Sequence, residues 1–329
     1  MTNSAAADSA HPPAAAHPWG GWALQRFGLL AFLALNVVVV SLLSPAFLKG
    51  ENILNILTQA APLGMVVIGQ TFVLLLGGLD LSVASVIATA AVLATSFETT
   101  DNRMVPVIFG SVILLGAFVG LANGYLVAKR KVSPFLATLA TTIVLQGIRF
   151  LYTQGSTGST LPEGFTVIGQ HRFLGLPINL LALALLALVC GYVLHFSPFG
   201  RRIYLVGGNP RGAKLVGIRS DAVIIACYVI CSVIAAIAGL FLVGYVGQVD
   251  QWTGKGYELD SIVAAVMGGV AITGGRGSIV GALLGVLILI VMFNAVILLG
   301  LPVQVQLILK GLIVIAAAAL YLSAGSRNA

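Results

Sequence analysis

The chain has 329 residues, of which 59% are hydrophobic and only 8% are charged, and its formal net charge is +7. A water-soluble domain carries about 25% charged residues, so this composition excludes an ordinary soluble globular protein. The basic residues are scattered over short segments rather than clustered. That scatter argues against a nucleic-acid-binding surface and is typical of the loops that orient a membrane protein.

Residues 1–25 form the first predicted region. They are rich in Ala, Pro and His and contain no apolar run. The acidic Asp8 and the lack of an early basic stretch argue against a signal peptide. We predict a disordered cytoplasmic tail at residues 1–25, followed by one transmembrane domain at residues 26–325.

Apolar stretches of about 20 residues recur through this domain, which is the length that crosses a hydrocarbon core of about 30 Å. They are continuous rather than alternating, and this pattern predicts α-helices and not the strands of a β-barrel. We therefore predict an all-α polytopic membrane protein with about ten transmembrane helices. The predicted spans are residues 27–47, 60–77, 79–97, 104–128, 134–152, 177–196, 222–246, 258–273, 277–300 and 302–322.

The basic residues test the orientation of this arrangement. If the N-terminus is cytoplasmic, the inside loops hold eleven Lys and Arg residues. The outside loops then hold four, which are Lys49, Arg103, Arg172 and Lys255. This bias agrees with the positive-inside rule. We predict that both termini are cytoplasmic.

A few polar or ionisable residues fall within or beside the predicted spans. Charge inside a membrane is costly, so each such residue is a candidate for a translocation pathway. Other roles remain open: the acids can cap helix N-termini, and the long basic side chains can extend to the membrane interface. Lys310 can also form an ion pair with an acid on another helix. The candidates are Asp80, Ser82, Arg149, Glu258, Asp260 and Lys310.

Small residues recur on one face of a predicted helix at Gly277, Gly281 and Gly285, after the pair Gly268-Gly269. Such faces let helix backbones approach closely in lipid. We interpret these glycines as packing positions rather than as contacts to a solute.

The longest predicted inside loop, residues 197–221, carries five basic residues. Pro198-Phe199-Gly200 is predicted to turn the chain out of the membrane. Asn209 can cap a short helix that has Pro210 at its first position, and Gly217 would end it. A short helix here suits docking to a soluble partner, and the alternative is that it lies on anionic lipid.

No catalytic constellation is recognisable in the sequence. The chain lacks the motif HExxH, the motif GxSxG and the phosphate-binding motif GxxxxGK[ST]. The glycine-rich stretch at residues 273–278 has neither the lysine nor the preceding strand of a phosphate cradle. We expect no enzyme activity, no cofactor and no metal site in this chain, and any ATP must be bound by a partner.

Several short motifs resemble, in order, those of ribose-type importer permeases driven by an ATP-binding cassette (ABC) ATPase. The first is Gly77-Gly-Leu-Asp-Leu-Ser82, and Asn123-Gly124 and residues 132–139 follow it. The later motifs are residues 200–204, Gly207-Gly-Asn209, Gly217-Ile218, residues 256–260, Gly268-Gly269, residues 274–278 and Lys310-Gly311.

The resemblance implies a ten-helix permease of the branched-chain amino acid and ribose permease superfamily, in a bacterial inner membrane. It implies an inverted repeat of helices 2–5 and 7–10, and a monosaccharide or similar small polar solute as cargo. The implied partners are a second permease subunit, a cytoplasmic ABC ATPase, a periplasmic solute-binding protein and membrane lipid, and nucleic acid is not among them. The coupling residues would be Gly207, Gly208, Asn209, Ala213, Gly217 and Ile218.

Two other classes of membrane protein are alternatives to an ABC importer permease. An ion-coupled secondary transporter would need acids near the middle of the membrane, and Asp80 is the candidate. A membrane-embedded enzyme is disfavoured because no catalytic cluster is present.

Overall fold

The computed structural model describes residues 18–156, 158, 160–250, 252–312 and 315, and it describes side chains from residue 27 onward. The described chain is mostly helical, as predicted. Most of the predicted tail lies outside the described residues. Helix α1 begins at Pro18, however, so residues 18–25 are helical and the predicted boundary of the tail was wrong there.

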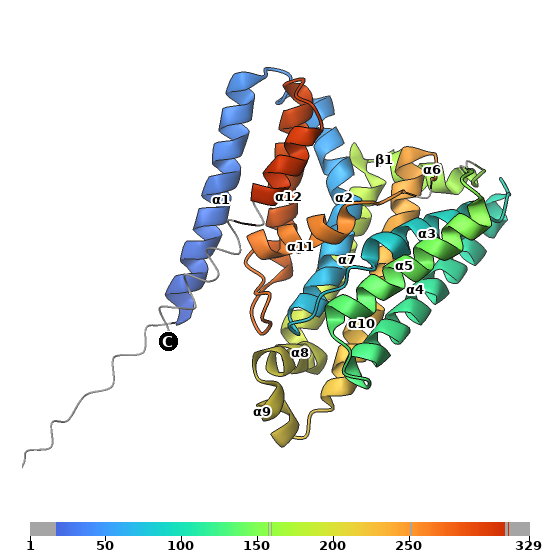
Figure 1. Cartoon of the computed structure of the whole chain (residues 1–329). Helices are drawn as coiled ribbons and strands as arrows, with labels where there is room; N and C mark the ends of the chain where they lie inside the picture. Colours follow the sequence, from blue (N-terminus) through green and yellow to red (C-terminus); the bar gives the residue numbers. More distant parts are fainter. Residues whose placement is uncertain (1–17, 157, 159, 251, 313–314, 316–329) are drawn as a thin grey trace, which may run out of the picture.

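The longer helices are the framework of the molecule (Figure 1). Within the described residues, six helical segments are long and apolar enough to cross a membrane. They contain α2 (Gly50–Leu74), α4 (Val105–Ala128), α5 (Pro134–Thr153), α7 (Ile178–Phe196), α10 (Ser220–Val246) and α12 (Ile279–Leu298). Helix α1 (Pro18–Leu43) packs against α12.

The shorter elements are the helices η1 (Asn102–Met104), α3 (Val83–Thr95), α6 (Glu163–Gln170), α8 (Pro198–Gly208), α9 (Pro210–Leu215) and α11 (Tyr257–Met267). Strands β1 (Arg172–Phe173) and β2 (Leu176–Pro177) pair antiparallel, with Arg172 opposite Pro177. After α12 the described chain is helical again at residues 304–312.

Two of the predicted spans are much shorter than expected. Helix α3 has 13 residues and α11 has 11, or about 20 Å and 17 Å of helix. Neither can cross a core of about 30 Å alone. The predicted eighth span was therefore wrong beyond Met267, because Gly268 ends α11 and Gly269 adopts a φ of +85°.

Helix α10 lies at the centre and packs against α2, α3 and α4. Its contact with α4 is close because α4 presents Gly116, Gly120 and Gly124 at four-residue spacing. A Cβ on any of them would overlap backbone atoms of α10. In the absence of a hydrophobic driving force between helices in lipid, such close van der Waals packing holds them together.

The predicted packing role of Gly268, Gly281 and Gly285 is confirmed at the α11–α12 contact. A Cβ on Gly268 would overlap the carbonyl of Gly281, and one on Gly285 would overlap the carbonyl of Ala264. These helices are therefore in backbone contact. The series is better explained by packing than by binding of a solute.

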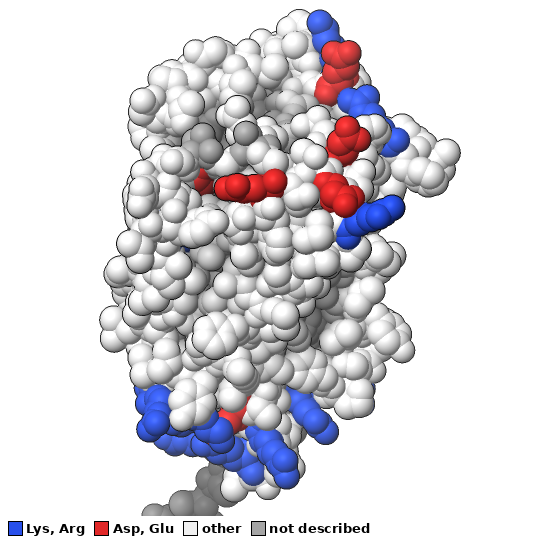
Figure 2. Space-filling view, turned by 90° about the vertical axis from the view of Figure 1, so that its right-hand side faces the viewer, with Lys and Arg blue, Asp and Glu red and all other residues white. Residues whose placement is uncertain are grey.

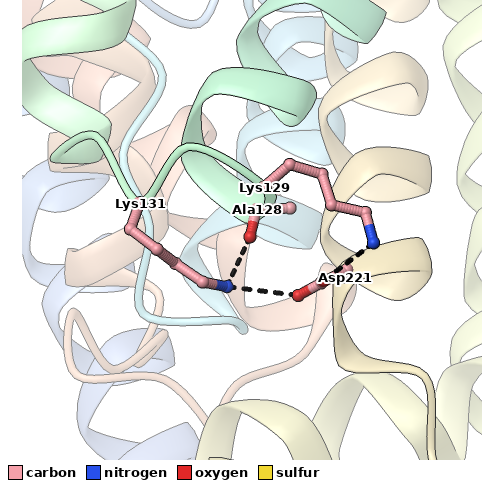
Figure 3. A network of polar contacts seen from close by, with 4 residues as sticks. All are labelled: Ala128, Lys129, Lys131 and Asp221. Atoms are coloured by element: carbon pink, nitrogen blue, oxygen red, sulfur yellow. Dashed lines mark hydrogen bonds and ion pairs between the residues drawn. The ribbon is translucent and has the colours of Figure 1, made fainter.

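The two ends of the bundle differ in charge. Figure 2 shows Lys and Arg gathered at the end that carries α8 and α9, with Asp and Glu mostly toward the opposite end. We call these the α9 end and the α6 end, after the short helices at residues 210–215 and 163–170. At the α9 end, Asp221 lies 3.0 Å from Lys129 Nζ and 3.2 Å from Lys131 Nζ (Figure 3). Lys131 also donates to the carbonyl of Ala128.

Candidate functional site

The predicted coupling loop contains two helices rather than one. The chain was predicted to turn at Pro198-Phe199-Gly200, and α7 does end at Phe196, but these three residues are the first turn of a second helix, α8. Ser197 caps α8 by accepting a hydrogen bond from Gly200 N at 3.0 Å. Proline fits this first turn because its missing N–H would have no helical partner there.

The second helix agrees with the prediction. Asn209 Oδ1 accepts a hydrogen bond from Gly212 N at 2.8 Å, and Pro210 begins α9. Gly217 follows the helix with a φ of +79°. Ala213 is buried, and its carbonyl accepts a hydrogen bond from Ile218 N at 3.0 Å. Asn209, Ala213, Gly217 and Ile218 therefore belong to one folded unit that projects at the α9 end (Figure 1).

The end of α8 meets two other loops through backbone atoms. A Cβ on Gly207 would overlap the carbonyl oxygen of Leu75, in the loop that follows α2. Gly275 N, in the loop between α11 and α12, donates a hydrogen bond to the same oxygen at 2.8 Å. A Cβ on Gly274 would in turn crowd Gly77 N and the Gly207 carbonyl. We call Leu75, Gly77, Gly207, Gly274 and Gly275 the glycine junction.

Tyr204 and Gly208, both on α8, lie beside the glycine junction. The Tyr204 hydroxyl donates to the carbonyl of Gly277 at 2.9 Å, and burial raises the pKa of this phenol above its ordinary value. Gly208 has more space around it than Gly207, since a Cβ on Gly208 would meet only Gly275 Cα at 3.8 Å. A movement of α8 would therefore reach residues 75–77 and 274–277 directly.

Asp80 and Ser82 lie in a buried polar network at the start of α3. Asp80 Oδ1 accepts hydrogen bonds from Ser82 N at 2.8 Å and from Ser82 Oγ at 2.5 Å. Asn123 Nδ2 donates to Ser82 Oγ at 3.0 Å, and Thr141 Oγ1 donates to Asn123 Oδ1 at 2.6 Å. The capping interpretation of Asp80 is wrong, because Ser82 is the N-cap residue of α3 and Asp80 bonds to Ser82 rather than to an N–H of the helix. The network ties α3 to α4 and α5.

Arg149 is buried, which argues against extension to the membrane interface, one of the alternatives that the sequence left open. It is 5% exposed, and its Nη1 donates to the Ser85 carbonyl at 2.9 Å and to Thr89 Oγ1 at 3.0 Å. Both acceptors lie on α3. The guanidinium is held inward because polar acceptors on the short helix satisfy it better than apolar surroundings would.

Lys310 pairs with Asp260, one of the alternatives that the sequence left open. Its Nζ lies 2.7 Å from Asp260 Oδ1 and 2.8 Å from Oδ2. Asp260 therefore does not serve mainly as a helix cap. Glu258 is closer to that role, since its Oε2 accepts from Gly256 N at 2.9 Å, directly before α11. The two acids were predicted together and have different partners.

Other polar pairs were missed by the sequence reasoning. Asn52 and Asn294 exchange hydrogen bonds of 3.0 Å and 2.8 Å between α2 and α12. The Gln70 side-chain amide lies 3.2 Å from both the carbonyl and the N–H of Asp80. Gln70 and Asn294 each stand as an amide inside an apolar stretch, a signal that was not among the predicted candidates.

Comparison with known proteins extends these observations. The family model described as "Branched-chain amino acid transport system / permease component" matches residues 52–318. The chain is 39% identical over 297 residues to the ribose import permease protein RbsC of Bacillus subtilis, covering 89% of this chain and 92% of the relative. It is 37% identical to RbsC of Escherichia coli K12, over 90% of this chain and 93% of the relative.

A more distant relative is the galactose/methyl galactoside import permease protein MglC of Escherichia coli K12, at 32% identity over 90% of this chain and 94% of the relative. No solved structure matches the chain. The family model covers most of the chain, including α8, α9 and the glycine junction. The protein belongs to the family of branched-chain amino acid transport system permease components.

Proposed function

We propose that the chain is the transmembrane permease subunit of an ABC importer in the bacterial inner membrane. It carries a monosaccharide or similar small polar solute into the cytoplasm, and a separate ATPase subunit supplies the energy. The names of its relatives support the cargo, since they are import permeases for ribose and galactosides. The observation that carries the mechanism is the glycine junction, which connects the projecting α8–α9 unit to loops inside the bundle.

In this proposal both termini are cytoplasmic and the α9 end faces the cytoplasm. The concentration of Lys and Arg at that end supports the orientation. The membrane is crossed by ten segments, two of which are completed by loops around α3 and α11. Those two helices are too short to cross alone.

An inverted repeat of helices 2–5 and 7–10 is supported by element order. Helices α2, α3, α4 and α5 run long, short, long, long, and α10, α11 and α12 begin the same series before residues 304–312. The packing is also repeated, since α10 contacts α3 and α4 while α2 contacts α11 and α12. In each half a basic residue of the last helix bonds to the short helix, Arg149 to α3 and Lys310 to α11.

The ATPase would dock on α9 and the end of α8. When two nucleotide-binding subunits close on ATP, they would pull the α8–α9 unit, and Gly207 would pass this displacement to Leu75 and Gly275. Because the backbone of α8 is in direct contact with the loops after α2 and α11, these loops would shift with α8. This shift would change access to a pathway formed with a second permease subunit, to which a periplasmic solute-binding protein delivers the solute.

Reconstitution tests this function. The purified chain alone in proteoliposomes should show neither ATP hydrolysis nor uphill uptake of D-ribose, L-arabinose or D-galactose. Addition of the ATPase and binding protein encoded with it should restore ATP-dependent uptake of at least one of them. Uphill uptake by the chain alone, driven by a proton or sodium gradient, would instead support the ion-coupled transporter and overturn the proposal.

A further inference from the structure

A mostly apolar cavity with a few polar side chains lies between α2, α10, α11 and α12, on the side toward the α6 end. Its volume is about 280 Å³, which is close to the lower limit of about 300 Å³ for small-molecule pockets. At roughly 30 Å³ per water, it would hold about nine waters, and a pentose or hexose has a similar number of heavy atoms. The residues that matter for its chemistry are Gln59, Tyr245, Tyr257, Asp260 and Phe293. We call this space the inner cavity.

A second cavity of about 390 Å³ adjoins the inner cavity. It shares Leu242 and Tyr257 with it and is lined by the loop between α10 and α11, including Asp250, Trp252 and Lys255. Trp252 is partly exposed, and Lys255 Nζ lies 4.6 Å from the centre of its ring. The two cavities together lead from this loop to the Asp260 carboxylate. Access to the inner cavity is therefore from the α6 end.

Asp260 is the charged residue in the lining of the inner cavity, and its charge is already paired. Asp260 is paired with Lys310, whose Nζ also lies 4.8 Å from the centre of the Phe293 ring. Gln59 and Tyr245 contribute neutral hydrogen-bonding groups, and both donate to Asn55 Oδ1, at 3.0 Å and 3.1 Å. A bound metal cation or organic anion would face a site without net opposite charge. The lining suits a neutral solute.

The aromatic residues in the lining narrow the chemical class of the solute further. Tyr245, Tyr257 and Phe293 surround a space that also contains a carboxylate and an amide. A monosaccharide has apolar C–H faces, which pack on aromatic rings, and hydroxyl groups, which both donate and accept hydrogen bonds. A purely apolar solute would cover the Gln59 amide and the Asp260 carboxylate without offering either a further hydrogen bond, and that costs binding free energy.

We propose that the inner cavity binds a neutral monosaccharide during transport, with hydroxyl groups bonded to Asp260, Gln59 and Tyr257 and a C–H face on the aromatic rings. Lys310 is then a positioning residue that holds the Asp260 carboxylate toward the solute. This inference rests on the proposed import function but is separable from it. An amino acid zwitterion is the competing occupant, because it could insert its own charges between Asp260 and Lys310.

The test uses the full chain in lipid nanodiscs and ligand-detected saturation-transfer NMR with D-ribose, D-galactose and L-leucine. We expect the wild type to bind a sugar and not L-leucine. Tyr257→Phe and Gln59→Leu keep most of the side-chain volume and remove hydrogen-bonding groups. Each should weaken sugar binding about tenfold, the effect of losing roughly one net hydrogen bond. Tyr192→Phe is the matched control, since Tyr192 is 65% exposed on α7.

The outcomes separate this inference from the import function. Sugar binding that is equal in wild type, Tyr257→Phe and Gln59→Leu would overturn the inner cavity as the site. Binding of L-leucine in preference to the sugars, or of none of the three, would overturn the assigned solute class. ATP-driven uptake in the complete assembly is measured in parallel with the same variants. Its absence in the wild type would contradict the import function itself, whatever the nanodisc result.

Discussion

Lys310 and Asp260 are 50 residues apart in the chain and form a two-oxygen ion pair, with Nζ 2.7 Å and 2.8 Å from the carboxylate oxygens. The Asp260 side chain is 7% exposed and the Lys310 side chain 21%. Each charge has lost most of its hydration, so each depends on the other. The pair fixes the last described helix against α11.

Lys310→Met should therefore be strongly destabilising. It leaves Asp260 buried without its counter-charge, at a cost of about 3–5 kcal/mol for a broken buried pair. The double variant Lys310→Met/Asp260→Asn should recover part of the loss, because no unpaired charge remains. The unfolding temperatures of the wild type, the single variant and the double variant in detergent rank their stabilities. Lys49→Met, at an exposed position, is the control. Destabilisations that simply add in the double variant would show that the two residues are not coupled.

Gly207→Ala should uncouple ATP hydrolysis from uptake. The new methyl group would overlap the Leu75 carbonyl and displace it from Gly275 N. We expect about a tenfold loss of uptake per ATP hydrolysed, within the range that coupling mutations reach. Gly208→Ala is the matched control, since a Cβ there has ordinary contact only. Equal uptake per ATP in the two variants would refute a transmitting role for the glycine junction.

Asn209→Ala should weaken α9 without disturbing the transmembrane helices. The variant loses the cap to Gly212 N, which is worth about 1 kcal/mol. Hydrogen exchange at residues 211–215 should become faster, and ATP-driven uptake should fall. Asn209→Asp retains an oxygen acceptor and should restore both. Faster exchange that spreads into α10 would point instead to general unfolding.

Gly120→Ala should loosen the α4–α10 contact. The added methyl group has no room beside Tyr228 and Val229, and overpacking of this kind costs about 1–3 kcal/mol. Gly110→Ala, on the same helix with open space around it, should leave the unfolding temperature nearly unchanged. A similar loss in both variants would attribute the effect to the helix backbone rather than to the contact.

Asp221→Asn should have only a small effect on stability. Its partners Lys129 and Lys131 are 53% and 64% exposed, and exposed ion pairs contribute about 0–1 kcal/mol. Any loss should shrink as salt is raised, because the solvent screens these charges. Unfolding temperatures of wild type and variant at low and high salt provide the measurement. A large loss that is insensitive to salt would contradict this assignment.

The long helices were predictable because hydrophobic length is a property of the local sequence. Helix α5 was predicted at 134–152 and observed as Pro134–Thr153, and α7 was predicted at 177–196 and observed as Ile178–Phe196. The helix around Asn209 was also predictable, since a cap and a first-turn proline act on adjacent residues. These signals need no knowledge of the rest of the fold.

The short helices and the partners of buried charges were not predictable in the same way. Residues 262–272 carry no polar side chain, but α11 stops at Met267 because the chain turns at Gly269 to meet α8. Likewise, nothing near Arg149 in sequence indicates that Ser85 and Thr89 will accept its hydrogen bonds. Those contacts join residues that are far apart in the sequence, so they depend on tertiary packing and not on the local sequence.

The glycine junction also bears on how such a subunit can change its partners. Its contacts are made by the main chain of Leu75, Gly207 and Gly275, while the side chains of Arg211, Lys214 and Leu215 on α9 face solvent. If α9 binds the ATPase as proposed, its surface can vary in evolution to fit a different ATPase without altering the internal contacts. On the proposed function, the residues that would bind the ATPase and those that would transmit its movement are different residues of one short segment.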